Sequence, residues 1–343
     1  MLRKFCIFFM ITGLLACDET GQHYAAVTLT GFTMGTTYTV KLNDFVEEKS
    51  GKTIQETVER ILEEINASMS TYRDDSELSR LNQSPGEIWI QVSPELFRVI
   101  ETALEIGFMS NGAYDPTIGP VVNLWGFGPV QRNGLPDDME ITQAMQLVGL
   151  DKISLDRQTQ SVKKTYTDVY IDLSGIAKGY AVDRVAEVLE EEYSLQNYLV
   201  EIGGEIRSRG INPEGDNWQI GIEKPEIMHR SINTIISIGD NSLATSGDYR
   251  NFIEIDGIQY SHTIDPETGR PVTHSLASVT VIQPECMYAD AWATALLVAG
   301  PGKGIELANR HGIAALFLVR ENNGYTEMTS NAFSTFLAAV TKK

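Results

Sequence analysis

Two oxygen-bearing side chains, Asp290 and Thr294, stand four residues apart in a run of alanines and one tryptophan. This spacing places both on one face of a helix, one turn apart. A carboxylate among apolar neighbours is costly unless it is paired, and a hard cation such as Mg²⁺ or Ca²⁺ would accept both oxygens as ligands. The alternative is an acid near a helix start, with a threonine bonded to the preceding turn. Taken alone, the pair is more typical of that second role.

A second group, residues 171–180, joins a predicted strand to a predicted helix through a turn of small residues. Such a turn presents backbone N–H groups to an anion at the start of the helix. Lys178 lies in the first helical turn, where the helix dipole disfavours a positive charge, and this indicates an anionic ligand. The spacing is neither a Walker A motif nor a dinucleotide fingerprint. A capped turn with a solvated lysine therefore stays open as the alternative.

His262, one of five histidines in the chain, lies at the end of a predicted strand that runs into a turn. A histidine beside a reacting hydroxyl can act as general base or acid near neutral pH. Hydrogen bonding to the following loop is an equally good explanation of this histidine alone. Asp265, which precedes a proline and a glycine, is more simply explained by turn formation.

Aromatic side chains lie among glycines and polar residues in two further stretches, residues 69–82 and 112–128. Tyr72, Tyr114 and Trp125 are the residues that could stack on a planar ligand. They could equally form a small hydrophobic cluster under a long loop. The sequence has no Gly-x-Ser-x-Gly nucleophile motif, no Cys/His zinc spacing and no His-Glu-x-x-His motif, so these common catalytic classes are excluded.

The order of these pieces resembles the ApbE family, the FAD:protein FMN transferases. The resemblance extends from about Phe32 to Ala299, most of the chain. The matching segments are residues 34–38 (MGTTY), 70–72 (STY), 112–115 (GAYD), 172–179 (DLSGIAKG), 201–204 (EIGG), 244–250 (ATSGDYR), 262–269 (HTIDPETG) and 289–294 (ADAWAT). Eight ordered matches are far more specific than any one of them.

The resemblance implies a reaction in which FAD is split at its pyrophosphate, FMN is transferred to a threonine hydroxyl of a target protein, and AMP is released. Asp290, Thr294 and the backbone carbonyl of Gly175 would hold Mg²⁺, the implied cofactor, and Asp290 would thereby be catalytic. His262 is the candidate for activating the acceptor threonine. The residues that would line the FAD site are Met34, Tyr72, Ala113, Tyr114, Asp115, Asp172, Lys178 and Ile264.

Two other functions remain open at this point. Water in place of threonine would make the protein an FAD pyrophosphatase that yields FMN and AMP. A non-enzymatic FAD-binding lipoprotein is the third possibility, although storage of FAD needs no acid–base group such as His262. The resemblance further implies acceptor flavoproteins that carry a threonine flavinylation motif, such as subunits of the sodium-pumping NADH:quinone reductase or of Rnf-type complexes.

These residues have to be positioned by an α+β fold. Apolar residues at helical spacing predict helices over residues 52–67, 94–110, 142–148, 175–192, 289–299 and 302–310. Apolar runs predict a hairpin from residue 25 to 42 and strands over 152–156, 160–164, 168–172, 198–202, 204–208, 217–222, 233–238, 259–264, 277–283 and 314–319. Residues 112–129 are rich in Gly and Pro and predict a loop. Because strands come in blocks, we expect mixed, largely antiparallel sheets packed with helices in a single ApbE-like catalytic domain.

The first residues predict a lipoprotein signal. Arg3 and Lys4 precede a short apolar run that ends in Leu-Leu-Ala-Cys17, which resembles a bacterial lipobox. We expect residues 1–16 to be the signal peptide, 17–24 a lipidated tether beginning at Cys17, and 25–343 the catalytic domain. Acyl chains on Cys17 would anchor the protein to a membrane, and Asp18 favours the periplasmic face of the inner membrane. The formal net charge of −19 argues against nucleic acid as a partner.

Overall fold

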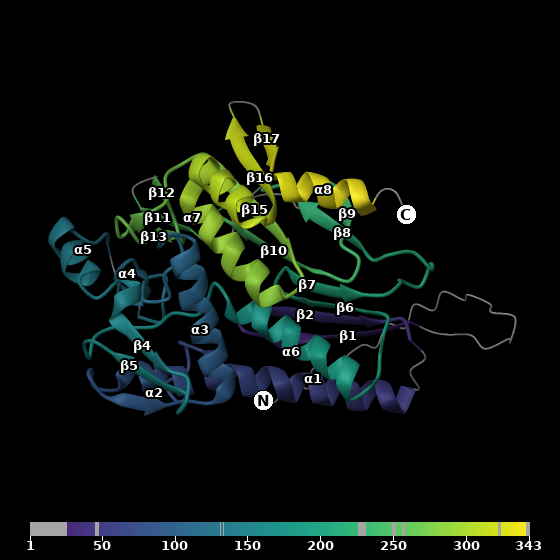
Figure 1. Cartoon of the computed structure of the whole chain (residues 1–343), viewed down its shortest axis with the longest axis horizontal. Helices are drawn as coiled ribbons and strands as arrows, with labels where there is room; N and C mark the ends of the chain where they lie inside the picture. Colours follow the sequence, from purple (N-terminus) through teal and green to yellow (C-terminus); the bar gives the residue numbers. More distant parts are fainter. Residues whose placement is uncertain are drawn as a thin grey trace, which may run out of the picture.

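The computed structural model describes residues 26–44, 48–130, 132, 134–225, 231–248, 252–255, 258–321 and 324–340. The predicted signal peptide, the tether and Cys17 lie outside these residues, so their assignment stays a prediction. An eight-stranded sheet, in which every paired neighbour is antiparallel, forms the centre of the molecule (Figure 1). In spatial order its strands are β1 (Val27–Thr33), β2 (Thr36–Leu42), β6 (Tyr198–Ile202), β7 (Glu205–Arg209), β10 (Ser242–Gly247), β15 (Leu276–Gln283), β16 (Ala314–Glu321) and β17 (Gly324–Thr329).

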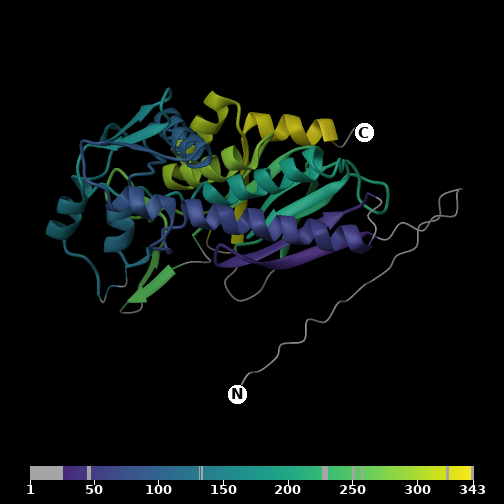
Figure 2. The same cartoon turned by 90° about the horizontal axis from the view of Figure 1, so that it is seen from below.

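Four longer helices pack against this sheet and one another, with α6 and α7 lying across the sheet and α1 running alongside α6 (Figures 1 and 2). They are α1 (Glu48–Met69), α3 (Pro94–Met109), α6 (Ala177–Glu191) and α7 (Cys286–His311). The apolar positions that predict α1, among them Ile54, Val58 and Ile65, are all buried. The predicted helices over 289–299 and 302–310 form the single element α7, which is kinked at Gly300, where φ is 74°. No described helix combines the length and apolar character needed to cross a membrane.

The remaining elements surround this centre. At one end of the molecule lie a three-stranded sheet and several short helices (Figure 1). Elsewhere α8 packs on β16 and the β8–β9 hairpin, and together they form a second apolar cluster. The elements are α2 (Glu77–Gln83), β3 (Trp89–Gln91), α4 (Gly119–Leu124), α5 (Asp138–Met145), the 3₁₀ turn η1 (Leu150–Lys152), β4 (Ile153–Asp156), β5 (Ser161–Lys164), β8 (Gln219–Glu223), β9 (Ile232–Ser237), β11 (Phe252–Ile255), β12 (Ile258–Ser261), β13 (Ile264–Asp265), β14 (Arg270–Pro271) and α8 (Asn331–Val340). The predicted α+β class with largely antiparallel sheets is confirmed.

Two local predictions are wrong. The strand expected over 168–172 is absent from the described structure, because the side chain of Asn82 takes the place of a neighbouring strand. Its Nδ2 donates to the Ile171 carbonyl at 2.9 Å, and its Oδ1 accepts from the Ile171 N–H at 2.8 Å. The loop expected over 112–129 contains α4, since Pro120 in the first helical turn needs no N–H partner and Val121 is buried beneath it.

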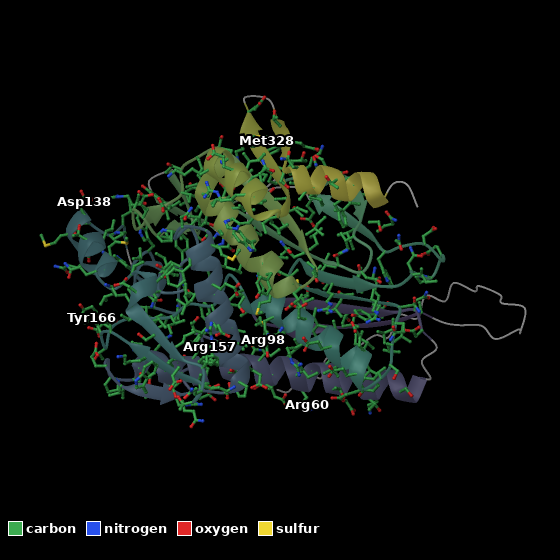
Figure 3. All side chains as sticks on the ribbon, viewed as in Figure 1. Arg60, Arg98, Asp138, Arg157, Tyr166 and Met328 are labelled. Atoms are coloured by element: carbon green, nitrogen blue, oxygen red, sulfur yellow. The ribbon has the colours of Figure 1, made fainter. Side chains whose placement is uncertain are left out.

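The crossing of α6 and α7 is fixed by a buried carboxylate and a glycine. Asp183 of α6 accepts hydrogen bonds from the N–H groups of Cys286 and Met287 at 2.9 and 2.8 Å, and so caps the start of α7. Its other partner is Arg207 of β7, at 2.8 Å. Arg98 of α3, which is labelled in Figure 3, also reaches Glu285, the residue before α7, at 3.0 Å. These contacts hold the start of α7 against α3, α6 and the sheet.

Gly179 permits the close approach of the two helices. A Cβ atom at this position would lie 2.3 Å from the Cys286 carbonyl oxygen and 2.8 Å from Cβ of Asp290. The Cys286 oxygen is a backbone atom and the Asp290 Cβ is bonded directly to the backbone, so neither atom can move away by side-chain rotation. The backbone N–H of Gly179 also donates to Asp290 Oδ2 at 3.0 Å, so the glycine sets the position of a predicted site residue.

We predict that Gly179→Ala lowers the free energy of unfolding by about 1–3 kcal/mol, because the added methyl group forces α6 and α7 apart. Urea unfolding followed by circular dichroism measures the change. Gly302→Ala is the matched control, since a Cβ atom added there would have no atom within 4 Å and alanine suits a helix. Equal stability of the two variants would contradict the close crossing.

Candidate functional site

A cleft of about 1180 Å³ is lined by residues at the ends of β7 and β10, among others. β10 pairs with β15 over six residues, but with β7 only through Ser242 and Leu243. Because β7 begins at Glu205, the last residues of β10 extend beyond it, and residues 203–206 and 245–247 both line the cleft. A volume of this size is sufficient for a ligand as large as a dinucleotide.

Every described residue that the sequence predicted for the site lines this one cleft, although these residues come from segments far apart in the chain. They are Met34, Tyr72, Ala113, Tyr114, Asp115, Asp172, Gly175, Lys178, His262, Ile264, Asp290 and Thr294. The structure describes seven of the eight matching segments in full. The exception is 244–250, because Tyr249 and Arg250 lie outside the described residues.

A lysine between two carboxylates lies at the floor of the cleft. Lys178 Nζ is 2.9 Å from Glu205 Oε1 and 3.6 Å from Asp290 Oδ1. Both carboxylates are buried, whereas the lysine side chain is 29% exposed and can meet a ligand. The two acids raise the pKa of Lys178 well above its usual range, against the opposing effect of desolvation. Desolvation raises the pKa of Glu205 to about 7, although the neighbouring ammonium opposes this shift. Lys178 is thus a fixed positive charge.

The oxygens of Asp290 and Thr294 lie on the cleft side of α7, as their spacing predicted. Gly175 is close to Thr294, since a Cβ atom there would lie 3.1 Å from Thr294 Oγ1. No group of three or more described His, Cys, Asp or Glu side chains could hold a metal ion. A carboxylate, a hydroxyl and a nearby backbone carbonyl are nevertheless the hard oxygen donors that Mg²⁺ accepts, with substrate phosphates completing the shell. This donor set fits the predicted cation.

The two aspartates predicted to line the FAD site also shape the loops that carry them. Asp115 Oδ1 accepts from the Thr117 hydroxyl at 2.6 Å and from its N–H at 2.8 Å, and burial raises the pKa of Asp115. Asp172 Oδ1 accepts from the Ser174 N–H at 2.8 Å and forms the turn before α6. Tyr114, which precedes Asp115, is 5% exposed, and its hydroxyl has no hydrogen-bond partner among the described residues. Burial raises the pKa of Tyr114, so this hydroxyl stays protonated.

The rim of the cleft carries a strained turn and an exposed ring. Met34 and Gly35 join β1 to β2 in a two-residue turn with φ of 49° and 72°, and positive values at both positions are typical of a type I′ hairpin. Strain at a non-glycine residue such as Met34 is often retained at ligand sites. Tyr72 is 68% exposed, and its hydroxyl donates to the Phe127 carbonyl at 3.0 Å. This bond fixes a ring face against which a planar ligand could stack.

His262 follows β12 and is partly buried at the cleft wall, with its ring centroid 6.4 Å from that of Phe127 in an edge arrangement. Asp265, three residues later, bonds to the Glu267 N–H and the Thr268 hydroxyl. The interpretation of Asp265 as a turn residue is therefore confirmed. His262 is the histidine among the described residues that line the cleft.

Two cleft residues escaped the sequence analysis, Glu205 and Ser246. Glu205 follows two glycines and looks like a turn acid, and only its contact with Lys178 across the sheet distinguishes it. The Ser246 hydroxyl lies 3.1 Å from Thr294 Oγ1, although 48 residues separate the two in sequence. Glu205 directly follows the matched segment 201–204, and Ser246 belongs to the matched segment 244–250. Their position in the sequence relative to these segments was the only signal that could have identified them.

Comparison with known proteins shows which proteins this chain is similar to. The sequence model of the ApbE family matches residues 34–317. The FAD:protein FMN transferase of Vibrio cholerae is 44% identical over 326 residues, which cover 95% of this chain and 96% of that protein. The FAD:protein FMN transferase of Escherichia coli K12 is 38% identical over 333 residues, covering 95% of this chain and 94% of that protein.

Solved structures agree as well. The flavin transferase ApbE from Vibrio cholerae superposes with a TM-score of 0.83 at 43% identity, covering 91% of this chain and 99% of that chain. The ApbE protein from Thermotoga maritima gives a TM-score of 0.81 at 30% identity, with the same coverage of 91% and 99%. Because the matches in sequence and in structure span most of its length, the chain belongs to the ApbE family.

Proposed function

We propose that this protein transfers FMN from FAD to a threonine hydroxyl of acceptor proteins and releases AMP, with Mg²⁺ as cofactor. The observation that carries the proposal is that a lysine, a set of hard oxygen donors and a histidine all line the same cleft. The names of the relatives, FAD:protein FMN transferases, support the same reaction.

In this reaction the acceptor oxygen attacks the phosphorus atom on the FMN side of the pyrophosphate. The bond to the bridging oxygen breaks, AMP leaves with that oxygen, and a phosphoester joins FMN to threonine. His262 would accept the hydroxyl proton as general base. The Lys178 ammonium would stabilise the negative charge on the phosphates, which is the main requirement of phosphoryl transfer.

The Mg²⁺ ion would be held by Asp290, Thr294 and the Gly175 carbonyl. When bound, it would neutralise charge on the pyrophosphate and so reduce repulsion toward the incoming oxygen. Tyr72 at the rim and the buried Tyr114 would bracket the FAD molecule. Water as acceptor would give the pyrophosphatase reaction in the same cleft, and the assay below separates the two.

We further propose that Cys17 is lipidated, that residues 1–16 are removed, and that the catalytic domain is held at the periplasmic face of the inner membrane. The lipobox-like Leu-Leu-Ala-Cys17 and Asp18 support this location. Acceptors in the same compartment would be flavoproteins with a threonine flavinylation motif, with subunits of sodium-pumping NADH:quinone reductase or Rnf-type complexes as the first choices.

The test of the activity is mass spectrometry of an acceptor domain after incubation with the purified protein, FAD and Mg²⁺. We expect a mass increase equal to phosphoester-linked FMN, which is lost when Mg²⁺ is chelated or Asp290 is replaced by alanine. Free FMN and AMP with unmodified acceptors would favour the pyrophosphatase. Intact FAD throughout would contradict both enzymatic functions.

For His262→Ala we predict a transfer rate reduced by about 10²–10⁴-fold, because a general base contributes rate enhancement of that order. FAD affinity, measured by equilibrium titration, should change little. His311→Ala, outside the cleft at the end of α7, is the control and should keep the parental rate. A parental rate in His262→Ala would reduce this histidine to a structural role.

Lipidation is tested by labelling cells with a fatty acid analogue. The intact chain should incorporate the label and Cys17→Ser should not, because the thiol is the first acylation site. Cys286→Ala is the matched control, since this cysteine is fully buried and should have no effect on labelling. Label retained in Cys17→Ser would place the modification elsewhere.

A further inference from the structure

Glu205, the first residue of β7, is a buried acid at the floor of the cleft, with 4% of its surface exposed. One carboxylate oxygen contacts Lys178 Nζ at 2.9 Å, and the other has no hydrogen-bond partner among the described residues. A buried carboxylate with one unsatisfied oxygen is destabilising. Its retention at the wall of a ligand cleft calls for a role in the site.

The role follows from what Lys178 would otherwise contact. The ion pairs of Lys178 within the described residues are those with Glu205 and Asp290, and the contact with Glu205 is shorter by 0.7 Å than the 3.6 Å contact with Asp290. The helix dipole repels a lysine in the first turn of α6, so the ammonium depends on these acids. Without a charge at position 205, the nearest carboxylate for Lys178 is Asp290.

Asp290 Oδ2 already accepts from the Gly179 N–H at 3.0 Å, so Oδ1, the oxygen that faces Lys178, is the more open of the two to a metal ion. A lysine that moved onto Oδ1 would compete with the divalent cation for the same oxygen. It would also withdraw its charge from bound phosphates.

We propose that Glu205 is a positioning residue that keeps Lys178 from moving closer to Asp290 than its present 3.6 Å, so that the lysine meets the phosphates while Asp290 binds the cation. The proposal deepens the function proposed above and rests on it. Glu205 acts only through Lys178 and makes no direct contact with the cation. Residues that orient metal ligands in this indirect way commonly change metal affinity when they are replaced.

The test is a double-mutant cycle read by direct binding of Mn²⁺. The full-length protein in detergent is titrated with Mn²⁺ in the presence of FAD and without acceptor, and free Mn²⁺ is followed by electron paramagnetic resonance. We expect Glu205→Gln to weaken Mn²⁺ binding by about 10- to 100-fold. Glu205→Asp, which keeps the charge on a shorter side chain, should be intermediate.

Lys178→Met supplies the decisive comparison. If Glu205 acts through the lysine, then Glu205→Gln in the Lys178→Met background should no longer weaken Mn²⁺ binding, because the competing ammonium is gone. Equal weakening in both backgrounds would overturn the proposal and indicate direct contact of Glu205 with the cation. Parental Mn²⁺ affinity in Glu205→Gln alone would also overturn it.

Glu190→Gln is the matched control, because Glu190 of α6 is a partly buried acid that pairs with Arg209 outside the cleft. It should leave Mn²⁺ affinity unchanged, and a loss as large as that of Glu205→Gln would contradict the specific role of Glu205.

In turnover assays the Mg²⁺ concentration for half-maximal AMP release should rise in Glu205→Gln, with kcat largely recovered at saturating Mg²⁺. If the unaltered chain releases no AMP, the proposed function fails, and the Mn²⁺ cycle still decides on Glu205 because it needs no turnover.

Discussion

The contact between Lys178 and its two acids is the interaction on which the cleft depends. The lysine comes from the start of α6, Asp290 from α7 and Glu205 from β7, so a single cation joins both helices to the sheet. This arrangement requires α6 and α7 to touch, which Gly179 permits because a side chain there would strike the Cys286 carbonyl. Two adjacent residues therefore set different properties of the site: Gly179 allows α6 and α7 to pack closely, and Lys178 supplies the positive charge between the two acids.

The central sheet contributes to the cleft at the point where β10 extends beyond its neighbour β7. β10 stays paired with β15 over six residues, whereas its pairing with β7 ends at Leu243, because β7 begins at Glu205 directly after the turn from β6. The residues of β10 beyond this point have no partner strand on that side in the described sheet, so their backbone and small side chains can meet a ligand. The sequence Ala-Thr-Ser-Gly at the end of β10 is suited to this position, and Ser246 uses its hydroxyl to contact Thr294 of α7.

The same features explain which parts were predictable. Periodic apolar residues predict α1 and α3 because those helices bury one continuous face. β10 escaped prediction because its small polar residues lack any strand pattern, and the expected strand over 168–172 is replaced by the Asn82 side chain. Ala113 and Ile264 were identified only through the ordered family motifs, since neither carries an evident chemical signal. Glu205 could not be found, because its role arises from a partner on another element.

The balance of charge in the cleft supports the divalent cation of the proposed reaction. Its described lining includes six carboxylates, on Asp115, Asp172, Glu201, Glu205, Glu223 and Asp290, against the cations Lys178 and Arg73. Arg73 is already paired with Glu63 and Asp75. A pyrophosphate placed here without added positive charge would be repelled by more acids than Lys178 can offset. Binding of FAD and of Mg²⁺ should therefore be coupled, each raising the affinity for the other by the same factor.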